Sequence, residues 1–415
     1  MACRPPQGHT SLTRRGAAAV AAVLLAATAA CAGSDGGPWS ADGRSERPAS
    51  VPSAAGGAAA ARGFTLVAGG GILPHDAIVR RARADARGDG YDFRPVLAGV
   101  RPVVSDADLA ICHLETVFET AEEQGGDEPG APAFTSPPQL ARDLAAIGYD
   151  ACSTASDHAL AAGAAGVERT LDALDTAGIR HAGTARSATE AHEPAWLKAG
   201  GARVAQLSYT YGPPGARLPE AQPWAVALID EERIVADARA ARRAGADVVL
   251  VSLHWGTAWQ TAPDERQLAL AGALTASTTA GRPDIDVIVG AAAHVPQAYE
   301  KVNGIWVVYG TGDQLAGAGA GAEGVGPDGR RDPRGDRATI ARFTFAPPAR
   351  PEGRWKVAKA EFVPQWMGVA SGLGVHPADA PAQGVAGGDR EEAMAAVSAA
   401  VLSRGAAADG LTRGR

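Results

Sequence analysis

Two short apolar runs stand out in the pattern of hydrophobic and polar positions along the chain. Residues 248–253 read Val-Val-Leu-Val-Ser-Leu, and residues 286–290 read Asp-Val-Ile-Val-Gly. Runs of this length that are rich in β-branched residues are typical of buried strands in a parallel sheet. Between them, residues 263–280 follow a helical pattern. This order predicts two parallel strands that are joined by a helix.

The same alternation continues through the rest of the chain. Further helices are predicted at residues 93–104, 137–147, 166–177, 231–244 and 390–402. Further strands are predicted at residues 64–68, 108–112, 149–154, 195–198, 204–209, 304–309, 339–345 and 355–363. The pattern predicts an α/β (α+β) fold in which helices cover a parallel or mixed sheet. A single domain over residues 63–365 accounts for nearly all of these elements.

The N-terminal segment is predicted to serve export. Two arginines precede a short apolar stretch at residues 17–27, and small residues lead from it to Cys31. The stretch is too short for a stable membrane span, and the arrangement resembles a bacterial lipoprotein signal over residues 1–30, with Cys31 as the lipidated residue. A plain secretory signal with an incidental cysteine is the alternative. Residues 31–62 are rich in Gly, Ala, Ser and Pro, which predicts a disordered tether.

Composition argues against nucleic acid as a partner and leaves open whether the two remaining cysteines form a disulfide. The formal net charge is −7 at pH 7, acidic and basic residues are mixed along the chain, and the absence of a basic stripe argues against nucleic acid. Cys112 and Cys152 remain after export and lipidation, and they either form a disulfide or stay as two buried thiols. Residues 366–415 are mostly Ala and Gly, which predicts a partly disordered tail with one helix.

Side chains that bind metals recur just after the predicted strands. Because ligands bind at the carboxyl ends of strands in open α/β sheets, these side chains are expected to converge. Imidazole and carboxylate groups in one cluster suit manganese, zinc or iron. A single histidine at a strand end is more often a structural residue, but repetition at five strand ends favours a metal site. The candidates are His75, Glu115, Asp157, His158, His254 and His294.

Six motifs around these residues resemble one family in their order along the chain. They read Gly-Gly-Ile-Leu-Pro-His at 70–75, His-Leu-Glu-Thr at 113–116, Ala-Ser-Asp-His at 155–158, Ser-Leu-His-Trp-Gly at 252–256, Ala-His-Val at 293–295 and Tyr-Gly-Thr-Gly-Asp at 309–313. The chain thereby resembles the CapA-type poly-γ-glutamate capsule synthesis proteins, which are related to calcineurin-like metallophosphatases. The resemblance implies a metallophosphatase-like β-sandwich flanked by helices, with a two-metal site at one edge.

The resemblance also assigns roles to the candidate residues. It implies that one metal contacts His75, Glu115 and His294. It implies that a second metal shares Glu115 and contacts Asp157 and His254. His158 would face the substrate and donate a proton or stabilise developing charge, although a strand-end cap is the simpler alternative. His113 and His181 are predicted to be structural.

Several positions depart from the family pattern. Gly71 stands where the family has Asp, and Ala291 and Ala292 replace two histidines. Asp157 and Asp313 each replace Asn, which keeps an oxygen ligand and adds charge. About three protein ligands remain for each metal, and three ligands with open positions still hold a metal in many enzymes. The expected occupancy is therefore two divalent ions, one ion, or none if the site has lost its metal.

Two functions follow from the resemblance. The first is a lipid-anchored envelope protein, exported and facing outside the cell membrane, that synthesises, anchors or trims an anionic extracellular polymer such as poly-γ-glutamate, or acts on an envelope phosphoester. Its chemistry would be metal-assisted hydrolysis or group transfer, within or beside a membrane synthase complex. The second is a non-catalytic relative that binds the polymer or a synthase partner, which the three missing ligands favour.

Overall fold

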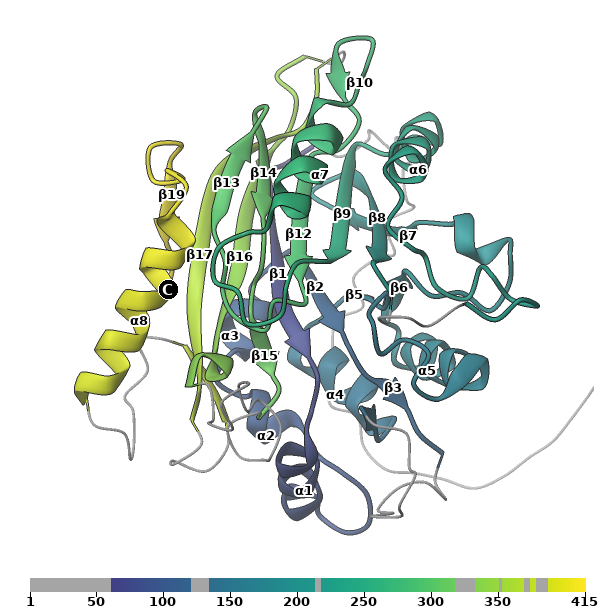
Figure 1. Cartoon of the computed structure of the whole chain (residues 1–415), viewed down its shortest axis with the longest axis vertical. Coiled ribbons are helices and arrows are strands. Elements are labelled where there is room, and N and C mark those ends of the chain that lie inside the picture. Colours follow the sequence, from purple (N-terminus) through teal and green to yellow (C-terminus); the bar gives the residue numbers. More distant parts are fainter. Residues whose placement is uncertain are drawn as a thin grey trace, which may run out of the picture. The chain divides into compact units, whose positions relative to one another are not determined.

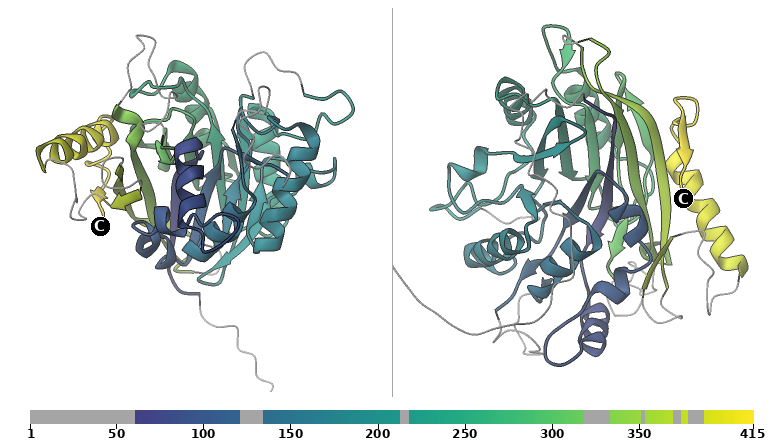
Figure 2. Two further views of the ribbon diagram at one scale, coloured as in Figure 1. Left: turned by 90° about the horizontal axis from the view of Figure 1, so that it is seen from below. Right: turned by 180° about the vertical axis from the view of Figure 1, so that it is seen from behind.

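Two β-sheets packed face to face form the centre of the fold (Figure 1). The structure is a computed structural model, and it describes residues 61–120, 134–212, 218–317, 333–350, 353–368, 374–377 and 387–415. Within these residues one sheet has nine strands and the other has six. Helices cover the outer faces, so the predicted α/β fold, a single-domain sandwich flanked by helices, is confirmed (Figure 2). The predicted signal peptide, Cys31 and nearly all of the predicted tether lie outside the described residues.

The nine-stranded sheet has the order β18-β17-β16-β1-β2-β5-β6, with β15 beside β1 and β19 beside β17. Strands β1, β2, β5 and β6 are parallel neighbours. Their carboxyl ends therefore lie at one edge of the sheet. The bounds are β1 Phe64–Ile72, β2 Leu109–Leu114, β5 Ala151–Ser153, β6 Arg180–Ala182, β15 Asp313–Leu315, β16 Arg337–Ala346, β17 Lys356–Gly368, β18 Gly374–Pro377 and β19 Leu411–Arg413.

The six-stranded sheet has the order β13-β14-β12-β9-β8-β7, and β14, β12, β9 and β8 are parallel neighbours. The bounds are β7 Ala195–Ala199, β8 Ala202–Thr210, β9 Val248–His254, β12 Val287–Ala291, β13 Tyr299–Val302 and β14 Ile305–Val308. Two small pairs complete the strands: β3 Val117–Phe118 with β4 Thr135–Ser136, and β10 Thr278–Thr279 with β11 Arg282–Pro283.

Alternation along β9 shows why its apolar run is buried on both faces. Val248 and Leu250 point into the core between the sheets, whereas Val249 and Val251 pack under the helices of the outer face. A strand that is covered on both sides needs apolar residues at every position, not at every second one. This is the physical basis of the uninterrupted run in the sequence.

The helices lie on the two outer faces of the sandwich. Helices α1 to α5 contribute to the hydrophobic cluster on the outer face of the nine-stranded sheet, and α6 and α7 contribute to the cluster on the six-stranded sheet. Their bounds are α1 Asp76–Asp85, α2 Arg94–Leu97, α3 Arg101–Ser105, α4 Gln139–Ile147, α5 Gly163–Ala177, α6 Glu231–Arg243 and α7 Glu265–Ala276. None of the helices in the described part of the chain has both the length and the apolar composition that a membrane span requires.

Several elements differ from the sequence-based expectation, and α1, β6, β13 and β15 are among those that were not predicted. The single helix predicted at residues 93–104 is two short helices, α2 and α3, and each begins with a proline in its first turn. Pro102 has no N–H to donate to an earlier carbonyl, so one continuous helix cannot run through it without losing a hydrogen bond. Helix α8, Gly387–Leu402, and strand β19 come after residue 365, yet Met394, Val397 and Leu411 belong to the core between the sheets. The packed core thus extends beyond residue 365 into the alanine-rich segment.

Candidate metal centre

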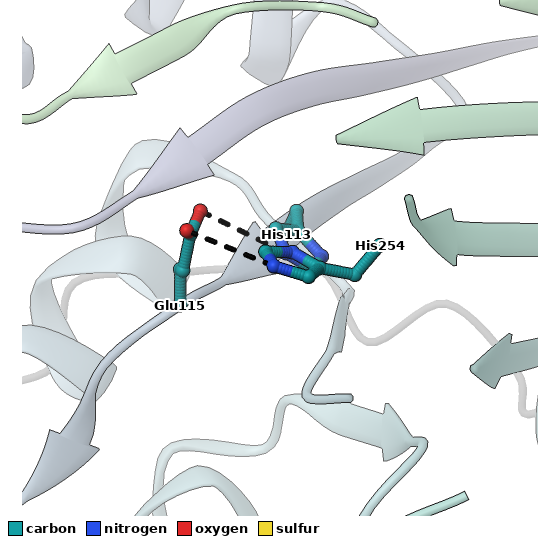
Figure 3. Close-up of side chains that lie close together, drawn as sticks. All are labelled: His113, Glu115 and His254. Carbon is teal, nitrogen blue, oxygen red and sulfur yellow. Dashed lines mark hydrogen bonds and ion pairs between the residues drawn. The ribbon is translucent and has the colours of Figure 1, made fainter. Parts of the chain in front are cut away.

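The candidate site lies where carboxyl ends of strands from both sheets meet. Glu115 follows β2, His254 ends β9, and the segment after β12 carries His294. Asp157 and His158 follow β5. His113 and Glu115 are two positions apart at the end of β2, and side chains so spaced along an extended chain point to the same side. Figure 3 shows His113, Glu115 and His254 grouped together.

Within the described residues, Glu115 is common to three overlapping groups of possible metal ligands. In each group the candidate ligand atoms lie within 4.8 Å of one another. The groups are His113 with Glu115 and His254, Glu115 with Asp157 and His158, and Glu115 with His294 and Asp313. The structure therefore brings together five of the six predicted residues. His75 belongs to none of these groups, and its role as a ligand stays a prediction.

The carboxylate of Glu115 is buried without the hydrogen bonds that a buried charge needs. The residue is 1% exposed, and neither carboxylate oxygen has a hydrogen-bond partner among the described residues. Burial raises its pKa to about 7, although the nearby His254 and His294 act in the opposite direction. The imidazole nitrogens His113 Nε2 and His254 Nε2 lie 3.9 Å and 4.0 Å from its oxygens, which is too far for hydrogen bonds. A buried carboxylate that lacks hydrogen bonds is strongly unfavourable, and binding a cation removes that penalty. The residues around Glu115 thus fit a divalent metal ion.

A chain of hydrogen bonds between the two sheets fixes the orientation of His254. Ser153 Oγ donates to the backbone carbonyl of Cys112 at 3.3 Å, because a carbonyl can only accept. The same oxygen lies 2.8 Å from His113 Nδ1, so it accepts the proton of that nitrogen. His113 Nε2 lies 2.9 Å from His254 Nδ1. Burial lowers the pKa of His113 well below its ordinary value, so its ring is neutral and Nε2 accepts from His254.

This chain leaves the other nitrogen of His254 available to a metal. With Nδ1 donating to His113, Nε2 of His254 lies 3.1 Å from Asp157 Oδ1 and 4.0 Å from Glu115 Oε1, so it pairs with these carboxylates here and would bind a metal in place of its proton. Metal-binding histidines are commonly held in this way by a hydrogen bond from the opposite ring nitrogen. His113, predicted to be structural, therefore contacts the site and orients a ligand. Its position two residues before Glu115 was the signal in the sequence.

A second pair, His294 and Asp313, lies on the other side of Glu115. His294 Nδ1 lies 3.0 Å from Asp313 Oδ2. Burial acts to lower the pKa of His294, but the adjacent carboxylate of Asp313 outweighs it and raises the pKa to about 10. Asp313 was noted in the sequence only as a replacement of Asn. The structure places its carboxylate as a further candidate ligand, because Gly71 of β1 is paired both with Asp313 and with His113.

Exposure distinguishes a buried floor from an accessible rim. The side chains of Glu115 and His254 are 1% and 6% exposed, whereas those of Asp157 and His158 are 32% and 21% exposed. Burial acts to raise the pKa of Asp157, but its contact with His254 lowers it well below the ordinary value. The ring of His158 lies 3.8 Å from that of Phe134. The rim residues can therefore contact a ligand that the floor residues cannot reach.

Comparison with known proteins identifies the family. The sequence pattern of the family described as "Bacterial capsule synthesis protein PGA_cap" matches residues 65–318, which include every residue of the candidate site. This chain belongs to that family. The match begins with β1 and ends after β15, so it covers the strands that carry the site.

Curated relatives of this capsule synthesis family match parts of the chain. A probable polyglutamine synthesis accessory protein of Mycobacterium tuberculosis is 30% identical over 220 residues, which are 50% of this chain and 55% of that protein. The capsule biosynthesis protein CapA of Bacillus anthracis is 28% identical over 156 residues, which are 37% of this chain and 36% of that protein. The chain thus spans between about a third and about half of the length of these relatives.

Among solved structures, a calcineurin-like phosphoesterase of Bacillus subtilis, YfkN, aligns with 81% of this chain and 97% of its own, at 12% identity and a TM-score of 0.40. A likeness at this TM-score supports no argument about the site. The geometry around Glu115 and the family match are the observations on which the function depends.

The departures of this chain from the family pattern lie inside the site. A β-carbon at Gly71 would lie 2.9 Å from Glu115 Oε2 and 2.9 Å from Asp313 Oδ1, so a side chain there would enter the cluster. Gly71 itself has no positive φ, and an aspartate meets no backbone obstacle there. Ala292 has a φ of 86°, a conformation that L-residues rarely adopt. A histidine at Ala292 would adopt the same conformation, so the backbone opposes it no more than it opposes the alanine.

Gly71→Asp tests whether the cluster is built for a cation. The added carboxylate would lie against Glu115 and Asp313, so we expect the metal-free variant to unfold at lower temperature because of like-charge repulsion. With Mn²⁺ or Zn²⁺ present, we expect at least about tenfold tighter metal binding than in the unaltered protein. Gly272→Asp on α7 adds the same charge in open space and serves as the control. Isothermal titration and thermal unfolding with and without metal measure both effects, and unchanged metal affinity would contradict the assignment.

Proposed function

We propose that this protein is an exported, lipid-anchored member of the capsule synthesis family that acts on an anionic envelope polymer, with a divalent metal held around Glu115. Poly-γ-glutamate is the polymer that the resemblance suggests, and an envelope phosphoester is the other substrate class. The observation that supports a metal is the buried carboxylate of Glu115, whose two oxygens have no hydrogen-bond partner in the part of the chain that the structure describes. The names of the relatives refer to capsule and polyglutamine synthesis, and they support the proposal that the substrate is an envelope polymer.

The proposed centre uses residues of both sheets. Glu115, His254, Asp157, His294 and Asp313 would hold the metal, which is Mn, Zn or Fe by the chemistry of this donor set. A bound divalent ion supplies Lewis-acid activation of the scissile group. His113 and Ser153 orient His254 through the hydrogen bonds described above.

His158 is proposed to contact the substrate. Its side chain is partly exposed, and its Nε2 lies 3.6 Å from Asp157 Oδ1. Burial lowers the pKa of His158 despite the adjacent carboxylate, so the ring is neutral near pH 7 and can donate or accept one proton. Phe134 lies against one face of the ring and restricts its orientation. These features suit proton transfer to or from a ligand at the rim.

His158→Ala should separate chemistry from metal binding. We expect the purified protein to contain a stoichiometric divalent metal and to hydrolyse poly-γ-glutamate or a generic phosphodiester only when the metal is present. The variant should keep its metal but lose activity by roughly 10²- to 10⁴-fold, the usual contribution of acid–base catalysis. His181→Ala, at a histidine paired with Asp175 away from the site, is the control.

The same measurements test the non-catalytic alternative. Gly71, Ala291 and Ala292, which replace family ligands, are the observations that favour it. Metal-independent binding of poly-γ-glutamate without hydrolysis of either substrate would support a binding protein and overturn the catalytic proposal. Metal-dependent hydrolysis of either substrate would overturn the binding protein.

Lipid attachment at Cys31 has its own test. Stable attachment of a protein to a membrane requires more than one acyl chain, which a lipoprotein cysteine carries. We expect the unaltered protein to sediment with membranes and Cys31→Ser to appear in the soluble exported fraction. Cys3→Ser, in the segment predicted to be removed, should have no effect. Equal membrane partition of both variants and the unaltered protein would contradict the anchor.

A further inference from the structure

A cavity of about 370 Å³ lies at the opposite end of the sheets from the candidate metal centre. Its walls come from α6, from the segments that precede β9 and β12, and from the connection between β16 and β17. These are the amino ends of β9 and β12, which lie near α6 and β10 in Figure 1. Five arginines line it, and we call it the arginine pocket: Arg239, Arg242, Arg243, Arg282 and Arg354.

The acidic groups near the arginine pocket already have partners. Asp284 accepts from Arg239 Nε at 2.9 Å and from Ser277 Oγ at 2.7 Å. Asp247 accepts from the backbone N–H of Arg203 at 2.8 Å. Behind the wall, Asp286 pairs with Arg242 and accepts from the backbone N–H of Val249 at 2.7 Å. Arg239 and Arg242 are thereby engaged, and Arg282 also has an interaction partner.

Positive charge remains after these pairs are formed. Nη1 of Arg354 is buried and has no hydrogen-bond partner within the described residues. Arg243 is exposed, and no ion pair or hydrogen bond of its guanidinium is seen in the described part of the chain. A buried guanidinium N–H that lacks an acceptor is unfavourable. Because Arg354 lies in the cavity wall, a small shift of its side chain would let an anion in the cavity accept from it. The planar fork of an arginine matches a carboxylate or a phosphate, which accepts two hydrogen bonds from it.

We propose that the arginine pocket binds carboxylate groups of an anionic ligand, and that this ligand is a segment of the polymer on which the protein acts. The identification of the ligand rests on the proposed function, whereas the anion site rests on the arginines alone. The cavity holds on the order of a dozen non-hydrogen atoms, at about 30 Å³ for each water-sized group. That volume accepts one acidic unit of such a polymer with part of the next.

The position of the pocket determines what it does. The arginine pocket lies at the amino end of β9 and the candidate metal centre at its carboxyl end. The seven residues of β9, at about 3.3 Å per residue, separate them by roughly 20 Å. No ligand that fits inside the arginine pocket also contacts Glu115. The pocket therefore holds the polymer at a distance from the metal centre, and it binds its ligand whether or not a metal is present.

Isothermal titration of the full chain with a five-residue γ-glutamate oligomer, at low ionic strength and without metal, tests the proposal. We expect saturable binding by the unaltered protein, and at least about tenfold weaker binding by Arg354→Gln and by Arg243→Gln. Arg243 is exposed, so its variant keeps the fold even if Arg354→Gln is destabilised. Arg80→Gln, on α1 with a side chain 70% exposed, removes one charge elsewhere and should bind the oligomer normally.

Two further titrations are needed. One distinguishes a carboxylate polymer from phosphate as the ligand, and the other distinguishes the arginine pocket from the metal centre as the binding site. Inorganic phosphate should bind more weakly than the oligomer, and equal or tighter binding of phosphate would overturn the assignment to a carboxylate polymer. Glu115→Gln, which disrupts the metal centre, should bind the oligomer as the unaltered protein does. If Glu115→Gln loses the oligomer while Arg354→Gln and Arg243→Gln keep it, the polymer is held at the metal centre and the arginine pocket is not its site.

Discussion

Glu115→Gln should lower the affinity for divalent metal by about 100-fold or more, the largest effect expected of any single substitution at the site. Glu115 is common to all three groups of possible ligands, so its loss affects every metal position. His113→Gln removes the ring that orients His254 and belongs to only one of the three groups, so it should lower the affinity by about tenfold. Isothermal titration with Mn²⁺ and Zn²⁺ gives both values.

Without metal, the same substitution, Glu115→Gln, should increase the stability of the protein. The pKa of Glu115 is about 7 in the folded chain against an ordinary value of 4.5. A raised carboxylate pKa means that stability is lost as the pH rises from about 4.5 through 7. At pH 8 the full penalty of roughly 3 kcal/mol applies, so metal-free Glu115→Gln should be more stable than the metal-free unaltered protein by up to about that amount. Near pH 4 the two should unfold alike.

Asp143 provides a matched control for this prediction. It is also a fully buried carboxylate, but it accepts hydrogen bonds from the backbone N–H of Phe93 at 2.8 Å and from Arg142 Nε at 3.0 Å. Asp143→Asn should therefore destabilise the protein and leave metal affinity unchanged. Urea unfolding of both variants, with and without metal, distinguishes the two kinds of carboxylate. If metal-free Glu115→Gln is less stable than the unaltered protein at pH 8, the carboxylate of Glu115 is not a buried charge that lacks hydrogen bonds, and the interpretation is wrong.

Removing the disulfide should cause the largest loss of stability. Cys112 of β2 and Cys152 of β5 are paired in register on neighbouring parallel strands, and a disulfide joins them. They are separated by 40 residues in sequence, and closing a loop of that length stabilises the fold by roughly 4 kcal/mol through the unfolded state. We expect Cys112→Ala/Cys152→Ala to unfold at a correspondingly lower urea concentration.

Reductant provides the internal control for the disulfide. It should destabilise the unaltered protein to about the level of the double variant and should leave the double variant unchanged. Because Cys112 is adjacent to His113, the variant should also be tested for metal affinity, which we expect to be nearly retained. If the unaltered protein unfolds at the same urea concentration with and without reductant, the disulfide does not contribute to stability.

The sequence by itself predicted many of the longer elements and most members of the candidate site. Apolar runs such as residues 248–253 predicted β9 because a strand that is covered on both faces has no polar position to interrupt the run. Glu115, Asp157, His158, His254 and His294 were found because each stands just after a run of this kind, and parallel strands bring such positions to one edge. The pattern is local, so a single chain is sufficient to recognise it.

Only the tertiary structure decided which groups contact one another. The contact between His113 and His254 crosses from one sheet to the other, over 141 positions in sequence, and no spacing along the chain predicts it. The pairing of Cys112 with Cys152 depended on strand order, and the position of Met394 in the core depended on how α8 packs. The arginine pocket likewise combines segments from three parts of the chain. Such contacts depend on sheet order and register, which side-chain packing across the whole fold determines and local periodicity does not.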